Sequence, residues 1–471
     1  MSPTTTNSVS PPVTNRRAFL RTAAAAAGVF SAPWIVPASM RGAFAPSNRI
    51  HVGIIGCGNQ STIDLPAFLG HSDCQVLAVC DVNQASHGYK TPDQFLGREP
   101  AREKVEAHYA AKTTSGSYSG CAVYEDFREL LDRQDIDAIA CIVPDHWHAL
   151  ITIMAARANK DIYCEKPLSL TIGHGQAMVK AVREHQRVLQ TGSHYRSSPA
   201  CRRACELVRN GRIGEVKRIV TQVAEINAVE PGPGWKPMPV PEGFNYDLWL
   251  GPAPDAPYHE GRCLYRFRFN LDYSGGQVTN FGAHSNDAAQ WALDMDASGP
   301  VEVEDQGSEW PAAGCLYNTA TKTAFRAKYA NGVELICQTA QPGFGVRFEG
   351  TEGWVEYGYN GLQTFPGSLK SSVIGPQETH LAASNPDRIE EAGKYHIPDH
   401  TRNFLDCIKS RRDPVACVEI GHRSATICHL GNIAMQLKRK LQWDPALEQF
   451  VNDDEANRML GRPMRKPWSL G

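Results

Sequence analysis

The sequence predicts an α/β fold in which a parallel sheet with helices on both faces is followed by a mostly antiparallel α+β domain. In the first part, short apolar runs rich in Val, Ile and Ala alternate with helical stretches, as in parallel strands joined by helices. Beyond residue 167, period-two runs with hairpin turns replace this alternation. The chain has 471 residues, more than one core ordinarily holds, so two domains are expected.

Four apolar runs are the expected strands of the first domain. Each is bounded by turn residues, and a helical stretch follows the first and the third run. This order predicts one parallel sheet covered on both faces. The runs are IHVGIIG at 50–56, CQVLAVCDV at 74–82, IDAIACIVP at 136–144 and KDIYCEKP at 160–167.

Hairpins and amphipathic helices characterise the second domain. Residues 215–227 alternate like a half-buried strand, and two later segments read as hairpins with Asn331-Gly332 and Glu352-Gly353 at their turns. The Pro-rich stretch 231–257 is a long loop, of a length that is usually functional or disordered. The two hairpins cover 322–339 and 346–359, and the two terminal helices cover 400–413 and 421–440.

Composition excludes several functional classes. The hydrophobic share of 42% and the charged share of 21% fit a soluble globular protein, and the net charge of −2 without a basic stripe argues against nucleic acid or an anionic membrane as partner. None of the 14 cysteines forms a C-x-x-C pair or a cluster with zinc spacing, so no metal site is expected. Most of these thiols are expected in the core, although an oxidised pair stays open.

The N-terminal residues have the features of an export signal. Residues 16–21, RRAFLR, resemble the twin-arginine signal, and a short, weakly apolar Ala-rich stretch follows at 23–32. Ala43-Phe44-Ala45 offers a small-residue cleavage site. We therefore expect a signal peptide at 1–45, recognition by the twin-arginine translocation machinery, a periplasmic or otherwise exported protein, and no stable membrane insertion.

The turn after the first strand has the pattern of a dinucleotide site. Residues 56–61, GCGNQS, match G-x-G-x-x-G except that Ser61 replaces the last glycine, and Asp81 ends the second strand where a ribose-binding acid is expected. Glycines there let the backbone approach a pyrophosphate at a helix N-terminus. No Arg or Lys directly follows Asp81, which favours NAD over NADP. The expected cofactor contacts are Gly56, Gly58, Asn59, Gln60 and Asp81.

The glycine turn at 56–61 is one of four segments that resemble the glucose-fructose oxidoreductase/inositol dehydrogenase (Gfo/Idh/MocA) family. The other three are CEKP at 164–167, DYSGGQVTNFGAH at 272–284 and RNFLDCIKSRRDP at 402–414. The chain is most similar to a branch rich in exported bacterial proteins. The resemblance implies an NAD(P)-binding Rossmann domain at 48–167 and a substrate-binding and oligomerisation domain with an open-faced sheet at 168–471. The substrate would lie between them, near the nicotinamide.

The resemblance also implies which residues react. Lys166 would contact the reacting hydroxyl, with Glu165 positioning it, because an ammonium lowers the pKa of the hydroxyl and stabilises the developing oxyanion. His284 would take the hydroxyl proton. The family's aspartate, four residues before that histidine, is Asn280 here, which can bind substrate but cannot act as a base. Asp287 could orient the imidazole or contact substrate instead.

Three further segments complete the expected site. The loop PDHWH at 144–148 follows a strand end, where ligands bind in open α/β sheets, and the resemblance puts it beside the nicotinamide. The segments 190–199 and 259–269 supply aromatic faces and guanidinium groups suited to a sugar or sugar acid. The residues expected here are Pro144, His146 and His148 for cofactor, and Tyr195, Arg196, Arg262, Tyr265 and Arg268 for substrate. Glu165 and Lys166 are expected to contact the cofactor as well.

These observations favour an NAD(P)-dependent oxidoreductase that transfers hydride between a nicotinamide cofactor and a sugar, a polyol or a sugar derivative. A redox-neutral NAD-dependent glycosidase and a non-catalytic carbohydrate-binding protein stay open as alternatives, the latter because of Asn280. A homo-oligomer is expected from the open sheet face. An exported enzyme without a nucleotide supply would hold its cofactor tightly and regenerate it in place.

Overall fold

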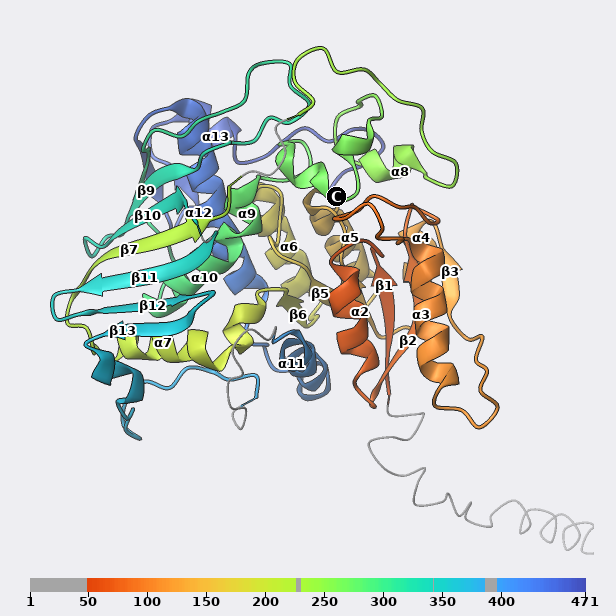
Figure 1. The fold of residues 1–471 in the computed structure, drawn as a ribbon, viewed down its shortest axis with the longest axis horizontal. Coiled ribbons are helices and arrows are strands. Elements are labelled where there is room, and N and C mark those ends of the chain that lie inside the picture. The colour runs from red at the N-terminus through yellow and green to blue at the C-terminus, as the bar shows by residue number, and fades with distance from the viewer. Residues whose placement is uncertain (1–48, 226–229, 342, 386–395) are drawn as a thin grey trace, which may run out of the picture. The chain divides into compact units, whose positions relative to one another are not determined.

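The structure, a computed structural model, is built on two sheets that lie side by side (Figure 1). Residues 50–471 form one compact unit. The expected signal peptide lies outside the described residues, which are 49–225, 230–341, 343–385 and 396–471.

The first sheet has six parallel strands in the order β3-β2-β1-β4-β5-β6. All four predicted strands are confirmed. Two further strands of three residues each were not predicted, because runs this short carry no periodicity. The strands are β1 (Ile50–Ile55), β2 (Cys74–Cys80), β3 (Ala122–Tyr124), β4 (Ala138–Cys141), β5 (Asp161–Cys164) and β6 (Leu189–Thr191).

Helices cover both faces of this sheet, as the alternation predicts. One core joins the sheet to α2, α3 and the late helix α11, and a second core joins it to α4, α5 and α6. Every second residue of the central strand turns to each face, so that Ile54 belongs to the first core and Ile55 to the second. The helices are α2 (Ser61–Leu69), α3 (Arg98–Ala110), α4 (Phe127–Leu131), α5 (Asp145–Arg157), α6 (Ile172–Glu184) and α11 (Ile397–Ser410).

The second sheet has nine strands in the order β13-β12-β11-β7-β10-β9-β8-β14-β15. Only β7 and β10 pair in parallel, so the sheet is mostly antiparallel, as predicted. Both predicted hairpins are confirmed as the pairs β9–β10 and β11–β12. The strands are β7 (Val216–Val223), β8 (Glu302–Asp305), β9 (Ala324–Lys328), β10 (Glu334–Thr339), β11 (Phe344–Gly350), β12 (Trp354–Gly358), β13 (Gly361–Phe365), β14 (Leu441–Asp444) and β15 (Gln449–Phe450).

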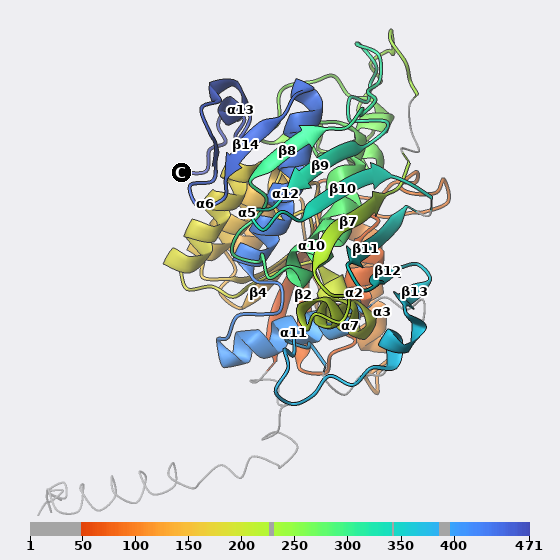
Figure 2. The ribbon, with the colours of Figure 1, turned by 90° about the vertical axis from the view of Figure 1, so that its left-hand side faces the viewer.

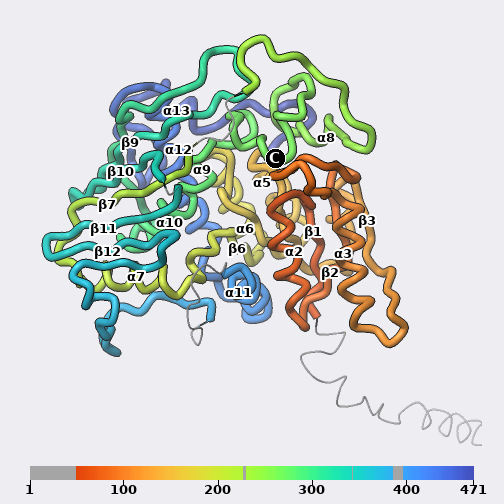
Figure 3. The backbone as a smooth tube through the Cα atoms, in the orientation of Figure 1, coloured from red at the N-terminus to blue at the C-terminus, as the bar shows by residue number. Residues whose placement is uncertain are grey.

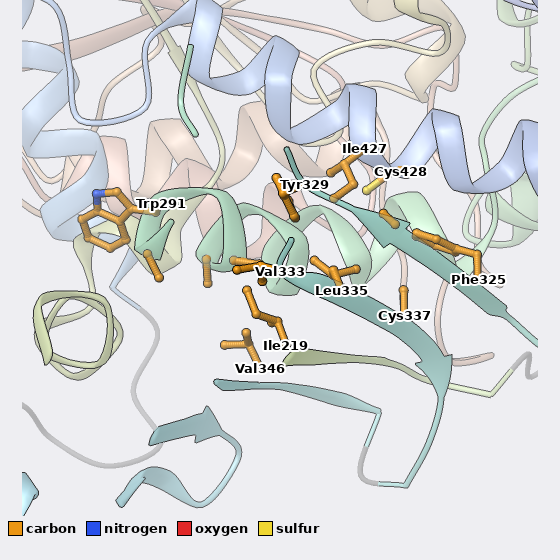
Figure 4. Close-up of a cluster of buried hydrophobic side chains, with 14 of the residues drawn as sticks. Ile219, Trp291, Phe325, Tyr329, Val333, Leu335, Cys337, Val346, Ile427 and Cys428 are labelled. Carbon is orange, nitrogen blue, oxygen red and sulfur yellow. The ribbon is translucent and has the colours of Figure 1, made fainter. Parts of the chain in front are cut away.

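Three helices pack on one face of the second sheet: α7 (Pro199–Arg209), α10 (Gly282–Ala292) and α12 (Val418–Leu437). Figure 4 shows the core between them, where Ile219, Leu335 and Val346 of the strands meet the helices. In Figure 2 the strands lie in front of α10 and α12, so that the opposite face of the sheet is turned to the viewer. The remaining short helices are α8 (Tyr246–Leu250), α9 (Gln277–Asn280) and α13 (Asp454–Arg458).

The chain crosses between the two sheets more than once. The first sheet ends at Thr191, beyond the expected domain boundary at residue 167, and α11 returns from the second half to pack on α2 (Figure 3). The helices α6 and α12 also contact each other. Within the described part of the chain, no helix is both long enough and apolar enough to cross a bilayer.

All 14 cysteines lie in the described part of the chain and are free thiols. Twelve are buried, and Cys315 and Cys417 are intermediate. The prediction of core thiols is therefore confirmed for most of them, and no pair in this structure is oxidised.

A buried group of charges ties the helices of the second domain together. The Arg196 guanidinium, in a short 3-10 helix at residues 194–197, donates to the carboxylate of Asp287 on α10 at 2.8–3.0 Å. It also donates to Asp296 at 2.7 and 3.0 Å. Ser424 of α12 donates to the Asp287 carboxylate as well. Arg196 and Asp287 are each only 2% exposed, so their pairing is shielded from water.

Replacing Arg196 by Leu should lower the free energy of unfolding by about 3–5 kcal/mol, because the Asp287 carboxylate then stays buried without a cation. Urea unfolding followed by circular dichroism measures the loss. Lys180→Ala is the matched control, since it removes an exposed pair with Glu184 and should cost no more than about 0.5 kcal/mol. Equal stability of the two variants would contradict a structural role for Arg196.

Candidate active site

A cavity of about 360 Å³ lies where the carboxyl ends of the first sheet face α9 and α10. It is at the point where the strand order reverses between β1 and β4, which is where ligands bind in open α/β sheets. The cavity brings together most of the residues that the sequence singles out. Those that line it are Gly56, Gly58, Asn59, Gln60, Asp81, Pro144, Glu165, Lys166, Tyr195, Tyr265, Arg268, Asn280 and His284.

Two glycines let the turn after β1 pack closely against neighbouring parts of the protein. Gly56 has φ +98°, and a Cβ there would lie 2.2 Å from the carbonyl oxygen of Ile142. A Cβ at Gly58 would lie 3.0 Å from the ring of Tyr89. Helix α2 begins directly after the turn, at Ser61. Backbone N–H groups at such a terminus fit a pyrophosphate, so this part of the cavity fits a dinucleotide.

Asp81 follows the last residue of β2 and faces the same part of the cavity. Its carboxylate accepts the backbone N–H of Cys57 at 2.6 Å and that of Asn83 at 2.8 Å. Burial raises the pKa of Asp81, and the two N–H donors oppose this rise. Arg98 donates to the carbonyl of Asp81 and pairs with Glu125 instead of the Asp81 carboxylate. The carboxylate keeps further lone pairs for a ribose hydroxyl.

Lys166 and Asn280 contact each other in the part of the cavity away from the glycine turn. The ammonium nitrogen of Lys166 donates to the backbone oxygen of Asn280 at 3.0 Å and to its side-chain oxygen at 3.1 Å. The amide of Asn280 donates to Gln277 at 2.9 Å, which orients that side-chain oxygen towards the lysine. Burial lowers the pKa of Lys166, Glu165 opposes this, and the positive charge of Arg268 adds to it.

Glu165 binds the backbone of Lys166. Its carboxylate accepts the backbone N–H of Lys166 at 3.2 Å and the Tyr163 hydroxyl at 3.3 Å. Gly192 makes room for it, since a Cβ there would lie 2.2 Å from a carboxylate oxygen. Burial raises the pKa of Glu165, and Lys166 opposes this rise.

His284, on the first turn of α10, lines the cavity together with a second histidine, His194. Its Nδ1 is buried and has no hydrogen-bond partner among the residues that the structure describes. Burial lowers the pKa of His284 well below its usual value, and the nearby Lys166 adds to this shift. The ring is therefore neutral near pH 7 and packs against the rings of His194 and Tyr195, each at a centroid distance of 4.8 Å.

Three predicted substrate contacts are not in the cavity wall. Arg196 and Asp287 bind each other in the buried charge group, so Asp287 neither orients His284 nor reaches substrate. Arg262 is 6% exposed and lies over the rings of Trp235 and Tyr273. The physical reason is the same in each case, because a buried guanidinium is satisfied by the nearest carboxylate or aromatic face. The prediction that Arg196, Asp287 and Arg262 contact the substrate is therefore wrong, and these residues stabilise the fold.

The two histidines in the first turn of α5, which the sequence predicts as cofactor contacts, also lie behind the cavity wall. The Nε2 of His146 bonds to the carbonyl oxygen of Trp249 at 2.9 Å. His148 bonds through both ring nitrogens to the carbonyl oxygens of Val143 and Pro167, at 2.9 and 2.8 Å. Although burial opposes protonation, Cys164, Asp145 and the Pro167 carbonyl raise the pKa of His148 to about 10. The charged ring thus joins the loop that carries Pro144 to the loop that carries Lys166.

Aromatic side chains form the wall beside Lys166 and His284. Tyr195 stacks on Phe344 of β11 with 4.5 Å between ring centroids, and Tyr359 packs edge-on to Phe344. Tyr265 lies on the same wall under the Arg268 guanidinium. Ring faces of this kind bind the C–H faces of a sugar, while the polar groups bind its hydroxyls.

Several lining residues escaped sequence reasoning, namely His194, Phe344 and Tyr359. Phe344 and Tyr359 come from a hairpin whose strand pattern only indicates a core face, so no local signal distinguishes them. His194 adjoins the predicted Tyr195 and could have been included on that ground. In the described part of the chain, no three His, Cys, Asp or Glu side chains converge as metal ligands.

Two family models match the chain. Residues 50–193 match the model described as oxidoreductase family, NAD-binding Rossmann fold. Residues 232–470, more than half of the chain, match the oxidoreductase family C-terminal alpha/beta domain of the Gfo/Idh/MocA group. The first match includes β6, in agreement with the observed extent of the parallel sheet.

Curated relatives match parts of the chain. Levoglucosan dehydrogenase of Pseudarthrobacter phenanthrenivorans is 38% identical over 91 residues, which are 19% of this chain and 23% of the relative. Inositol 2-dehydrogenase of Rhizobium meliloti is 28% identical over 170 residues, 36% of this chain and 44% of the relative. In these matches the chain spans less than half the length of the curated relative.

Solved structures share the fold over most of the chain. Aldose-aldose oxidoreductase from Caulobacter crescentus, solved with glycerol, has a TM-score of 0.56 at 21% identity and covers 84% of this chain and 99% of its own. WlbA dehydrogenase from Bordetella pertussis, solved with NADH and UDP-GlcNAcA, has a TM-score of 0.57 at 17% identity with the same coverage. From its glycine turn to its C-terminal helices, the chain belongs to the Gfo/Idh/MocA oxidoreductase family, with an NAD-binding Rossmann domain.

Proposed function

We propose that the protein is an NAD-dependent oxidoreductase that removes hydride from a CH–OH group of a sugar, a polyol or a sugar derivative. The observation that carries the proposal is the meeting of Lys166, Asn280 and His284 in one cavity with the glycine turn and Asp81. Sugar and polyol dehydrogenases among the relatives support the same reaction class. Asp81 supports NAD, because its carboxylate would repel a 2′-phosphate.

Each residue near the reacting carbon has a separate task. A bound nicotinamide supplies the hydride acceptor. The Lys166 ammonium, held by the two oxygens of Asn280, donates a hydrogen bond to the substrate hydroxyl and stabilises the oxygen as its proton leaves. The neutral imidazole of His284, which lines the cavity, accepts that proton. Phe344, the buried ring of the aromatic wall, shields these groups from water on one side, which strengthens these interactions.

Asn280 changes the charge of this group compared with the aspartate of the family pattern. A carboxylate in contact with Lys166 would stabilise its protonated form and raise its pKa. The amide oxygen binds the ammonium without adding a negative charge. We therefore expect Asn280 to position Lys166 and leave the proton transfer to His284.

We also propose export through the twin-arginine pathway and assembly as a homo-oligomer. Arg16-Arg17 and the Ala-rich stretch after them support export, and the second sheet, with its helices on one face, supports a contact between copies. The pathway moves folded proteins, so the Rossmann domain can close on its cofactor beforehand. An exported enzyme is then expected to retain and regenerate NAD in place.

Replacing Lys166 by Met should lower kcat by about 100-fold or more, since the hydroxyl loses its charged donor, while NAD affinity stays within about twofold. Reduction of NAD with a panel of sugars and polyols measures kcat, and fluorescence titration measures affinity. Lys160→Met is the matched control, because Lys160 is a buried lysine of the same domain that donates to the carbonyl oxygens of Arg133 and Ile136. Full turnover in Lys166→Met would remove this residue from the mechanism.

Both limbs of the pH profile of kcat/KM should lie below the ordinary pKa values of histidine and lysine. The reaction needs neutral His284, whose lowered pKa keeps it neutral below pH 6.5, so the acid limb should lie below that value. It also needs protonated Lys166, whose pKa is lowered from 10.5, so activity should fall before that pH is reached. Asn280→Asp should move the alkaline limb upwards. An acid limb at or above pH 6.5 would contradict proton transfer to His284.

Export should depend on the paired arginines. The double variant Arg16→Lys and Arg17→Lys should stay in the cytosol. Wild-type protein recovered from the exported fraction should release NAD, and not NADP, when it is denatured. Fractionation with immunoblotting and mass spectrometry of the released nucleotide measure both. Export of the double variant would contradict the pathway, and release of NADP or of no nucleotide would contradict the cofactor proposal.

A further inference from the structure

Arg268 is a second cation in the wall of the active-site cavity. It belongs to a short 3-10 helix at residues 266–269, and it lines the cavity together with Lys166 and Asp145. The positive charge of Arg268 acts on Lys166, and the negative charge of Asp145 acts on Arg268, so these groups are electrostatic neighbours. Arg268 takes no part in the proposed hydride and proton transfer.

No carboxylate in the described part of the chain forms an ion pair with Arg268. Asp145 lies beyond ion-pair distance, and its own carboxylate accepts the Ser274 hydroxyl at 2.6 Å. Glu165 is bound to the backbone N–H of Lys166 and to Tyr163. Burial lowers the pKa of Arg268, as expected of a guanidinium that leaves water without a counter-charge.

Aromatic rings fix the orientation of this guanidinium. Its central carbon lies 3.8 Å from the ring centre of Tyr265 and 5.4 Å from that of Phe267. Stacking on one face leaves the N–H groups at the edge of the plane available, and a planar edge with paired N–H donors matches a carboxylate. A flexible surface arginine would not be held in this way.

We propose that Arg268 binds a carboxylate of the substrate, so that the preferred substrate is a sugar acid, such as a uronic or aldonic acid, and not a neutral sugar. The inference rests on the proposed function and names its substrate class. The carboxylate would neutralise the second cation of the cavity, while Lys166 binds the hydroxyl that is oxidised. The phosphates of the cofactor are the competing anion, and they are expected at the glycine turn, not among the neighbours of Arg268.

The experiment compares matched acid and neutral ligands on the NAD-loaded enzyme. The pairs are D-glucuronate with D-glucose, D-galacturonate with D-galactose, and D-gluconate with D-glucitol. Binding is followed by tryptophan fluorescence, and hydride transfer by the absorbance of NADH. At least one acid should bind about tenfold more tightly than its neutral partner, since hydrogen bonds to a charged group have this strength.

Arg268→Gln should abolish that preference, so that the acid binds no more tightly than its neutral partner. Arg268→Lys keeps the charge without the planar donor pair and should retain part of the preference, which also serves if the glutamine variant is unstable. Arg266→Gln, two residues away on an exposed side chain outside the cavity, is the matched control and should change nothing.

Three results would overturn the inference. They are the absence of an acid preference in every pair, an unchanged preference in Arg268→Gln, and a loss of NAD affinity in that variant, which would assign Arg268 to the cofactor. Oxidation of neutral sugars with no acid preference would leave the proposed function intact and refute only this inference. Binding of an acid without any hydride transfer would refute the proposed function and leave the binding of a carboxylate by Arg268 intact.

Discussion

The hydrogen bonds from the Lys166 ammonium to the two oxygens of Asn280 join the chemistry of the two halves of this protein. Lys166 follows the last residues of a strand in the parallel sheet, whereas Asn280 ends a short helix of the second domain. In the proposed function, this contact holds Lys166 between the part of the cavity that would bind the cofactor and the part that would bind the substrate. Glu165 accepts the backbone N–H of Lys166, and Gln277 accepts a hydrogen bond from the Asn280 amide, so both partners are held in place.

Buried charges around the cavity serve this arrangement in different ways. Glu165 and the His148 imidazolium fix the loop that carries Lys166, one through its backbone N–H and the other through the Pro167 carbonyl. Arg196 and Asp287 neutralise each other and hold α10, on which His284 lies. Such pairs contribute little net stability but strongly penalise loss of one member. The positive charge of Arg268 has no such internal partner in the described residues, and this difference distinguishes a binding group from a structural one.

Sequence reasoning succeeded where the physical signal is local. The glycine turn, Asp81 and the strands β1, β2, β4 and β5 were predicted because apolar runs and turn residues act within a few positions. It failed for Arg196, Asp287 and Arg262, because whether a guanidinium faces a ligand or a carboxylate depends on residues about 90 positions away or on rings of another loop. It also missed Phe344 and Tyr359, which a hairpin brings to the cavity.

The sequence by itself therefore determined the two-domain α/β plan, the family and the motif that contains Lys166, since motifs and periodicity are properties of short segments. Only the tertiary structure decided that Asn280 binds Lys166, that His284 stays neutral through burial, and that Arg196 is a core residue while Arg268 faces the cavity. The physical reason is that charge pairing and desolvation depend on distances in space, which the order of residues along the chain does not contain.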